Sequence, residues 1–264
     1  MIQQIYDEQD LPLEDLQKVG LAKDGRLNLN DDDLTALLAG RRTGMLRLEN
    51  LFSDGLHIPY LDAKLSLKPN PIGDLDLLVH PIYKLAEKPS YLTDSEAEKL
   101  EKGDRVNIEK MIFDDEGYPK DILVEFDKDT NEFIVTDQAR ILAPDRINGE
   151  YLSLDQKERY RKGKEVELKD GTTIQYSATD KNGIRSNKLA FIASVLVDGG
   201  LSFALYHGLN ALFGQKKHGE DADVYSKGYY EDLEKMQNQE QQGKKQRQEP
   251  EKEYSRSYTR AGSR

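Results

Sequence analysis

Two stretches of similar sequence, YLTDSEAEKLEKG at residues 91–103 and YLSLDQKERYRKG at residues 151–163, decide the fold. Both open with Tyr-Leu and a hydroxylated residue, both close with Lys-Gly, and a valine follows three residues after each glycine. A fainter copy, LNDDDLTALLAG, occupies residues 29–40. Internal similarity of this kind predicts a repeated supersecondary unit.

Each copy carries the signals of a short helix. It opens on an N-cap residue type, whose side-chain oxygen accepts a hydrogen bond from a free amide, and acidic residues follow where the helix dipole favours them. These N-cap residues are Asn30, Thr93 and Ser153. A glycine that can adopt the left-handed conformation ends each helix. These glycines are Gly40, Gly103 and Gly163, and the residues expected to face the core just before them are Leu37, Leu100 and Tyr160.

After each glycine the apolar residues alternate with polar ones, which is typical of strands. The expected strands are residues 45–51, 56–67 and 75–80, then 105–113, 122–126 and 132–136, then 165–168 and 172–176. Asp170-Gly171 is a strong hairpin signal. The predicted order is αβββ, αβββ, αββ, with one further helix at residues 13–19. Linkers are expected at residues 87–90 and 143–149, where proline, asparagine and glycine break the periodicity.

The pattern predicts an α+β fold of repeated short-helix and antiparallel β-meander units, followed by a C-terminal helical segment and a disordered tail. The predicted divisions are residues 1–88 (the first helix and an αβββ unit), 89–150 (a second αβββ unit), 151–214 (an αββ unit with an apolar helical pair) and 215–264 (a mostly disordered tail). One helix on a three-stranded meander is marginal alone, so neighbouring units are expected to pack together.

Residues 188–213 form the most apolar stretch, and its length would span a bilayer. Asp198 lies at its middle, which costs about 2.5–3.5 kcal/mol on insertion scales. We therefore expect two helices broken at residues 198–200 that pack on the repeat units, self-associate or bind a partner protein. The expected contact residues are Leu189, Phe191, Ile192, Leu196, Leu201, Phe203, Leu205 and Leu209. Flanking lysines and arginines keep membrane contact as a less favoured alternative.

From Gln237 onward the chain holds no Val, Ile, Leu or Phe, so it is expected to be disordered, although residues 224–236 can form one amphipathic helix. Residues 244–264 hold seven basic and three acidic residues, or about +4. Charge interleaved with tyrosine can contact single-stranded nucleic acid, whereas the simpler interpretation is a solubilising tail. The nucleic-acid alternative uses Lys244, Lys245, Arg247, Arg256, Tyr258 and Arg260, with a basic face that includes Arg41, Arg42 and Arg47.

Composition argues against the common kinds of reactive site. The net charge of −11 opposes non-specific duplex binding by the folded part, and the absence of cysteine removes thiol chemistry and disulfides. The four histidines lack metal-ligand spacing, and no phosphate-binding or nucleophile motif is present. Asp127, Asp129 and Asn131 begin like a calcium loop, but Glu132 stands where that loop needs glycine. No catalytic, cofactor or metal site is therefore predicted.

Three segments together resemble a pair of adjoining domain families of unknown function. They contain LPLEDLQKVG and LTALLAGRRT within residues 11–43, PSYLTDSEAEKLEKGDRV through APDRINGEYLS at residues 89–153, and LSLDQKERYRKG through LYHGLNALF at residues 152–213. These families occur in proteins of conjugative transposons and related mobile elements of Bacteroidetes. The resemblance implies a bacterial cytoplasmic protein near genes for DNA transfer, and it implies no activity, cofactor or catalytic residue.

The residues and the resemblance together predict a non-enzymatic interaction or adaptor protein of a mobile element. It would bind a partner protein, or itself, through residues 189–213. The alternative is a nucleic-acid accessory factor in conjugative transfer that acts through the basic tail. Residues 1–10 hold neither a basic region nor an apolar run, so no signal peptide is expected and the predicted compartment is the cytoplasm.

Overall fold

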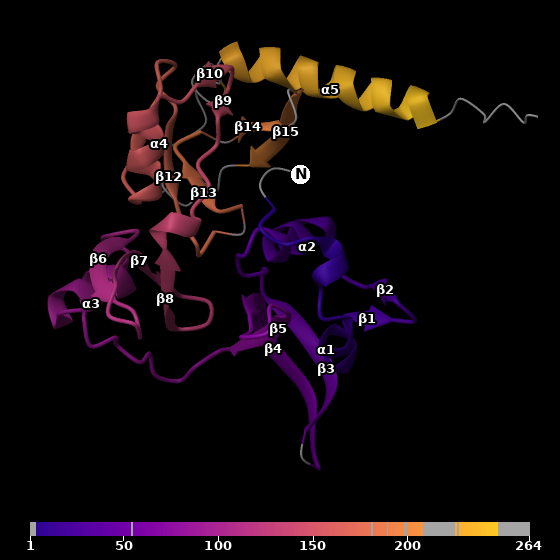
Figure 1. The fold of residues 1–264 in the computed structure, drawn as a ribbon, viewed down its shortest axis with the longest axis vertical. Coiled ribbons are helices and arrows are strands. Elements are labelled where there is room, and N and C mark those ends of the chain that lie inside the picture. Colours follow the sequence, from indigo (N-terminus) through magenta and orange to yellow (C-terminus); the bar gives the residue numbers. More distant parts are fainter. Residues whose placement is uncertain are drawn as a thin grey trace, which may run out of the picture.

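Three small antiparallel sheets, each preceded by a short helix, follow one another along the chain (Figure 1). The computed structural model describes residues 4–53, 55–180, 182–188, 190–197, 200–207, 225 and 227–247. Unit 1 comprises α2 (Asp31–Leu38), β3 (Leu46–Ser53), β4 (Leu56–Pro69) and β5 (Leu75–Pro81). Unit 2 comprises α3 (Asp94–Lys102), β6 (Ile108–Phe113), β7 (Pro119–Asp127) and β8 (Glu132–Asp137). Unit 3 comprises α4 (Leu154–Arg161), β11 (Val166–Glu167), β12 (Thr173–Tyr176) and β13 (Ile184–Ser186).

The helix signals read from the sequence are confirmed in all three units. Asn30 accepts a hydrogen bond from the amide of Asp33, and Thr93 and Ser153 each form a reciprocal capping box. The glycines that follow have positive φ values: 69° for Gly40, 80° for Gly103 and 64° for Gly163. The residues predicted to face the core, Leu37, Leu100 and Tyr160, are buried. Local chemistry therefore starts and stops each helix in the same way.

Each sheet is a meander in which the second strand lies at the centre. The strand orders are β3-β4-β5, β6-β7-β8 and β11-β12-β13. The sequence did not indicate β13, because three residues are too few to show a period of two. In the structure Tyr176 pairs with Ile184, so β13 closes a hairpin on β12. The prediction of two strands in the third unit is thus corrected to three.

The prediction of two helices in residues 189–213 is wrong, because β14 (Ala190–Val197) and β15 (Gly200–His207) form an antiparallel hairpin there. In the sequence these two eight-residue strands are separated by Asp198 and Gly199, and short apolar runs of this kind are consistent with either strands or buried helices. The first four residues of β14 are all buried, so this strand is covered on both faces and shows no alternation. Residues 208–213 lie outside the described residues.

The expected linker at residues 143–149 is also part of the fold. Ala143 is buried, and β9 (Arg146–Ile147) pairs with both β10 (Glu150–Tyr151) and β14. Asn148 and Gly149 have positive φ and form the turn between β9 and β10. The resulting sheet has the order β10-β9-β14-β15 and packs beside unit 3.

Helix α5 (Lys227–Arg247) crosses this last sheet (Figure 1). The helix predicted at residues 224–236 is thus confirmed, but it continues through residues that had been expected to be disordered. Glu, Gln and Lys are good helix formers and prolong a helix whose first turns are docked. Tyr229 packs against Ala190 and Ile192, and Asp232 is fully buried and accepts a hydrogen bond from Arg146 Nη2 at 2.7 Å.

The N-terminal part adds η1 (Glu8–Asp10), α1 (Leu13–Lys18), and a hairpin of β1 (Ala22–Lys23) and β2 (Arg26–Leu27), while η2 (Gln138–Arg140) follows β8. The helix predicted at residues 13–19 is confirmed. Units 2 and 3 share an apolar core, since Leu123 and Ile134 join the cluster built around Tyr160 and Phe191. Across the described part of the chain, the helices lack the length and apolar character required to cross a membrane.

Gly228 sets how closely α5 approaches the sheet. A Cβ atom at this position would lie 1.8 Å from the carbonyl oxygen of Asn148. Gly228→Ala should therefore displace the helix, although alanine is the better helix former by about 1 kcal/mol. We expect overpacking to cost about 1–3 kcal/mol and hydrogen exchange of residues 229–239 to accelerate about tenfold. Exchange measured by mass spectrometry checks this. Glu231→Ala, an exposed change on the same helix, should leave exchange unchanged, and equal protection in both variants would contradict the close contact.

Candidate functional site: a basic cavity where the three units meet

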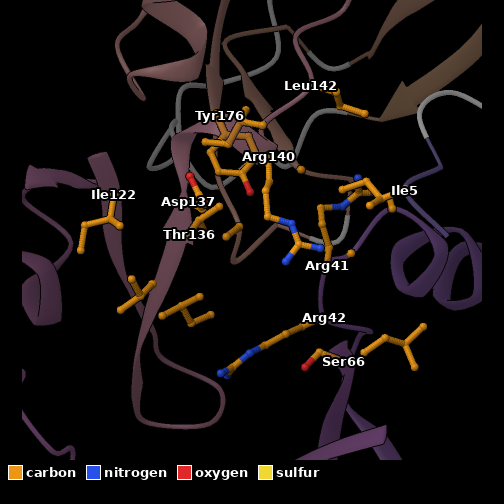
Figure 2. A pocket seen from close by; sticks show the side chains of 18 of the residues that line it. Ile5, Arg41, Arg42, Ser66, Ile122, Thr136, Asp137, Arg140, Leu142 and Tyr176 are labelled. Atoms are coloured by element: carbon orange, nitrogen blue, oxygen red, sulfur yellow. The ribbon is translucent and has the colours of Figure 1, made fainter. Parts of the chain in front are cut away.

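A cavity of about 430 Å³ lies where the three units meet, and this size is typical of ligand pockets. Its lining combines residues from unit 1, from the strands of unit 2 and the segment that follows them, and from the loop that joins β12 to β13. In Figure 2 the side chains of Arg41, Arg42 and Arg140 extend into the space between Thr136 and Asp137 on one side and Ile5 and Ser66 on the other.

The lining is positively charged, although the chain carries a net charge of −11. Among the described residues that line the cavity, the cations are Arg41, Arg42, Lys68, Lys120 and Arg140, and the carboxylate is Asp137. Lys120 lies 3.0 Å from Asp137 and neutralises it. A concave, partly apolar wall strengthens the field of cations within it, so a lining of this kind favours anionic groups.

The arginines are positioned by the C-terminal ends of two short helices, α2 and η2. Arg41 and Arg42 follow Gly40, the glycine that ends α2, and Arg140 ends η2. The Arg140 guanidinium donates to the Tyr6 hydroxyl at 2.6 Å, a bond that uses one of its five N–H donors. Gly183 has φ of 73°, and a Cβ there would lie 2.9 Å from Arg41 Cδ. A glycine at position 183 therefore leaves room for the Arg41 side chain.

A buried ion-pair network joins unit 1 to unit 2, and its member Arg42 also lines the cavity. Lys64 Nζ donates to both carboxylate oxygens of Asp127, at 2.9 and 3.0 Å, and the side chains are only 5% and 2% exposed. Asp129 contacts the same ammonium at 2.8 Å. Arg42 donates to Glu132 at 2.7 Å and lies 3.6 Å from Asp127. Asp127 and Asp129, whose spacing resembles the start of a calcium loop, thus bind Lys64 of unit 1.

Ser66, His80 and Glu132 lie in the order of a catalytic triad beside this network. Ser66 Oγ is 2.8 Å from His80 Nε2, and His80 Nδ1 is 3.6 Å from Glu132. Burial and the neighbouring Arg42 lower the pKa of His80 to about 4. A general base works best with a pKa near the operating pH, and Glu132 is already paired with Arg42. The geometry is therefore better suited to positioning Ser66 than to activating it.

Glu125 joins unit 2 to unit 3. Its buried carboxylate accepts hydrogen bonds from the Ala178 amide at 2.7 Å and from the Ser177 hydroxyl at 2.8 Å. Burial raises the pKa of Glu125 to about 7, against the opposing effect of these donors and of Thr179. Burial, and next the charge of Glu125, raise the pKa of the cavity residue Tyr176, whose phenol therefore stays protonated at neutral pH.

The residues predicted to bind a partner from two helices do not form one exposed surface among the described residues. Phe191 and Ile192 are fully buried, the first in the core shared by units 2 and 3 and the second under α5. These two therefore hold the chain together. Leu196, Leu201, Phe203 and Leu205 lie on β14 and β15, where the structure describes the main chain alone, and Leu189 and Leu209 lie outside the described residues.

Of the basic residues in the nucleic-acid alternative, the structure brings Arg41 and Arg42 together in the cavity. Arg47 lies on β3 instead, where it donates to both oxygens of Asp62 at 2.9 and 3.0 Å. Lys244, Lys245 and Arg247 belong to the C-terminal end of α5, for which the main chain alone is described. Arg256, Tyr258 and Arg260 lie outside the described residues.

One comparison with known proteins gives a match, and it covers unit 1 and the N-terminal helices. Residues 6–89 match the family model described as "Protein of unknown function (DUF4099)". This segment supplies the lining residues Arg41, Arg42, Lys68 and His80, so one wall of the cavity comes from the matched domain. No curated protein and no solved structure matches the chain. Among the described residues, no group of three or more His, Asp or Glu is placed to hold a metal ion.

Sequence reasoning missed most of the cavity. Lys68, Lys120 and Arg140 lie in three different elements, far apart in the chain, and each is an ordinary surface lysine or arginine in its local pattern. Ser66, His80 and Glu132 likewise share no motif spacing. The one available signal was Gly40-Arg41-Arg42, two cations directly after a helix stop.

The buried pair between Lys64 and Asp127 should be strongly coupled. Removing one partner leaves an unpaired buried charge, so Lys64→Met and Asp127→Asn should each lower the free energy of unfolding by about 3–5 kcal/mol. The double variant should lose less than the sum, with a coupling of about 0.5–3 kcal/mol. Urea unfolding of all four proteins measures this. The exposed pair Lys18 and Asp15, treated in the same way, should show no measurable coupling, and additive losses at Lys64 and Asp127 would contradict the linkage.

Glu125 should make stability depend on pH. Its folded-state pKa of about 7 exceeds the ordinary 4.5, so the folded protein holds a proton that the unfolded chain releases between these values. Stability conferred by this group therefore falls as pH rises through that window, by at most about 3 kcal/mol. Glu125→Gln mimics the protonated acid and should gain stability over the parent at pH 8 but not at pH 5. Urea unfolding at both pH values checks this, with exposed Glu101→Gln as control; an equal difference at both pH values would exclude the effect.

Proposed function

We propose that this chain is a non-enzymatic binding protein, an adaptor, that recognises an anionic group of its partner in the cavity between the three units. The observation that carries the proposal is the excess of cations around a concave site in a chain of net charge −11. Lys68 and Arg140 are the residues that we assign to the ligand. Arg42 belongs to the support, because Glu132 and Asp127 already occupy its guanidinium.

The non-enzymatic part of the proposal is supported by the state of the groups that could do chemistry. The low pKa of His80 leaves it neutral but weakly basic, and Tyr176 holds its proton. Lys64, Asp127 and Glu132 are engaged in the ion-pair network. A rigid site with neutral hydrogen-bonding groups and a few cations is suited to binding and orienting a ligand.

The cellular setting is part of the proposal. The match of residues 6–89 to a family of unknown function, and the resemblance of residues 11–213 to domains of conjugative transposons, support a bacterial mobile element as the context. A cytoplasmic location would agree with a chain that lacks cysteine. In that setting an adaptor would connect proteins of the element, and the tail beyond α5 would act as a tether.

Calorimetric titration with three anionic probes tests the function. Inorganic pyrophosphate, tricarballylate and hexaglutamate are the probes, and we expect at least one to bind, more weakly as salt is raised. Lys68→Glu with Arg140→Glu should weaken binding at least about tenfold, because two attractive charges become repulsive. Both side chains are exposed, so the variant should keep the parent's unfolding midpoint. Arg26→Glu, a charge reversal on the β1–β2 hairpin, is the matched control and should bind as the parent does.

Two outcomes would contradict the proposal. Binding that the cavity variant and the control weaken equally would place the anion elsewhere, and no binding of any probe would remove the site. Hydrolysis of p-nitrophenyl acetate by the parent but not by Ser66→Ala would show that the Ser66–His80 pair is catalytic.

A further inference from the structure

Strand β8 meets the cavity along its free edge. Successive residues of a strand point to opposite faces, so a strand seen face-on contributes every second residue to a cavity wall. Strand β5 does so, through Leu78 and His80, and β7 does so through Lys120 and Ile122. Strand β8 instead contributes residues 133–137 without a gap, as does β4 at Ser66, Leu67 and Lys68, which lie beyond the end of its pairing with β3 at Ala63. A continuous run of lining residues indicates that the strand lies edge-on to the cavity.

The outer edge of β8 carries main-chain N–H and C=O groups that can form further hydrogen bonds. In the sheet order β6-β7-β8, β8 is a terminal strand and pairs with β7. Within the described part of the chain, the main chain of residues 133–136 makes no hydrogen bond to a segment other than β7. An edge strand presents a row of unpaired N–H and C=O groups, which is the template for adding another strand.

The residues around this edge indicate what kind of peptide strand could be added to it. Arg41, Lys68 and Arg140 surround the same cavity, while Leu78, Phe133 and Ile5 supply apolar surface. A segment in which acidic residues alternate with apolar ones presents one kind of side chain on each face. Such a segment can direct its carboxylates to the cations and its apolar side chains to the opposite wall. Peptides that join an exposed sheet edge gain affinity from main-chain hydrogen bonds and specificity from alternate side chains.

We propose that the ligand of this cavity is an extended acidic peptide segment of a partner protein, which adds to the free edge of β8 as a further strand. Its carboxylates bind Lys68 and Arg140. This inference rests on the proposed function and specifies the partner: main-chain pairing requires a polypeptide, whereas the cations alone would accept any anion.

Alternate N-methylation separates strand addition from binding by charge. The probe is fluorescein-labelled Glu-Val-Glu-Val-Glu-Val, capped at its C-terminus as the amide, and its binding to the full chain is followed by anisotropy. One derivative is N-methylated at the glutamates and the other at the valines, so each loses one row of main-chain donors. Strand addition uses one row, so one derivative should lose binding at least about tenfold while the other stays close to the parent peptide. The matched Lys-Val peptide should not bind.

The protein variants and competitors complete the test. Lys68→Glu with Arg140→Glu should weaken the peptide at least about tenfold, and Arg26→Glu should not. Equal affinity of the two N-methylated peptides would overturn strand addition. Binding of pyrophosphate or hexaglutamate without binding of the Glu-Val peptide would overturn this inference and leave the proposed function standing. Failure of every probe would overturn both. A peptide displaced by unlabelled phosphorylated single-stranded DNA, which itself binds more tightly, would assign the cavity to nucleic acid and also overturn the inference.

Discussion

The ion pair between Lys64 and Asp127 determines how the first unit meets the second, and the cavity depends on it. Units 2 and 3 are joined by a common apolar core, in which Leu123 and Ile134 pack with Phe191. Between units 1 and 2, by contrast, a buried charge network makes the connection. Apolar surfaces can slide and repack, whereas a buried ammonium needs its carboxylate at one place and in one orientation. The position of unit 1, and therefore of Arg41, Arg42 and Lys68, follows from that requirement.

The same network sets the chemistry of the site. Arg42 neutralises Glu132 and helps to lower the pKa of His80, so the Ser66–His80 pair lies beside a guanidinium that opposes imidazolium formation. Arg41 and Arg140 are placed by a helix stop and a short 3-10 helix and extend toward the cavity. Arg42 thus supports the junction, while Lys68 and Arg140 are the cations that we propose for a ligand. This organisation supports the proposal that the site binds through charge and main-chain groups rather than by moving a proton.

The repeated unit is too small to form a hydrophobic core by itself, and each of the three copies buries its apolar residues against different additional elements. Unit 1 adds α1 and the β1–β2 hairpin, and unit 2 places Leu123 and Ile134 in the core of unit 3. Unit 3 adds the sheet β10-β9-β14-β15, which α5 covers through Gly228, Tyr229 and Asp232. The family match covers the first of these assemblies, residues 6–89, while the cavity needs all three.

The sequence by itself determined the local structure: Thr93 and Ser153 cap their helices, Gly103 and Gly163 end them, and alternating residues form the strands that follow. These features act within a few residues, so their chemistry can be read directly from neighbouring positions. Tertiary structure alone decided that residues 190–207 form a hairpin, since a strand buried on both faces has the same apolar composition as a buried helix. It also decided the site. Lys64 and Asp127 are 63 residues apart, and Lys68 and Arg140 belong to different units, so nothing in their local patterns distinguishes them from surface charges. Only the packing of the three units against one another, which depends on the sum of many weak contacts at long range, brings these charges to a common cavity.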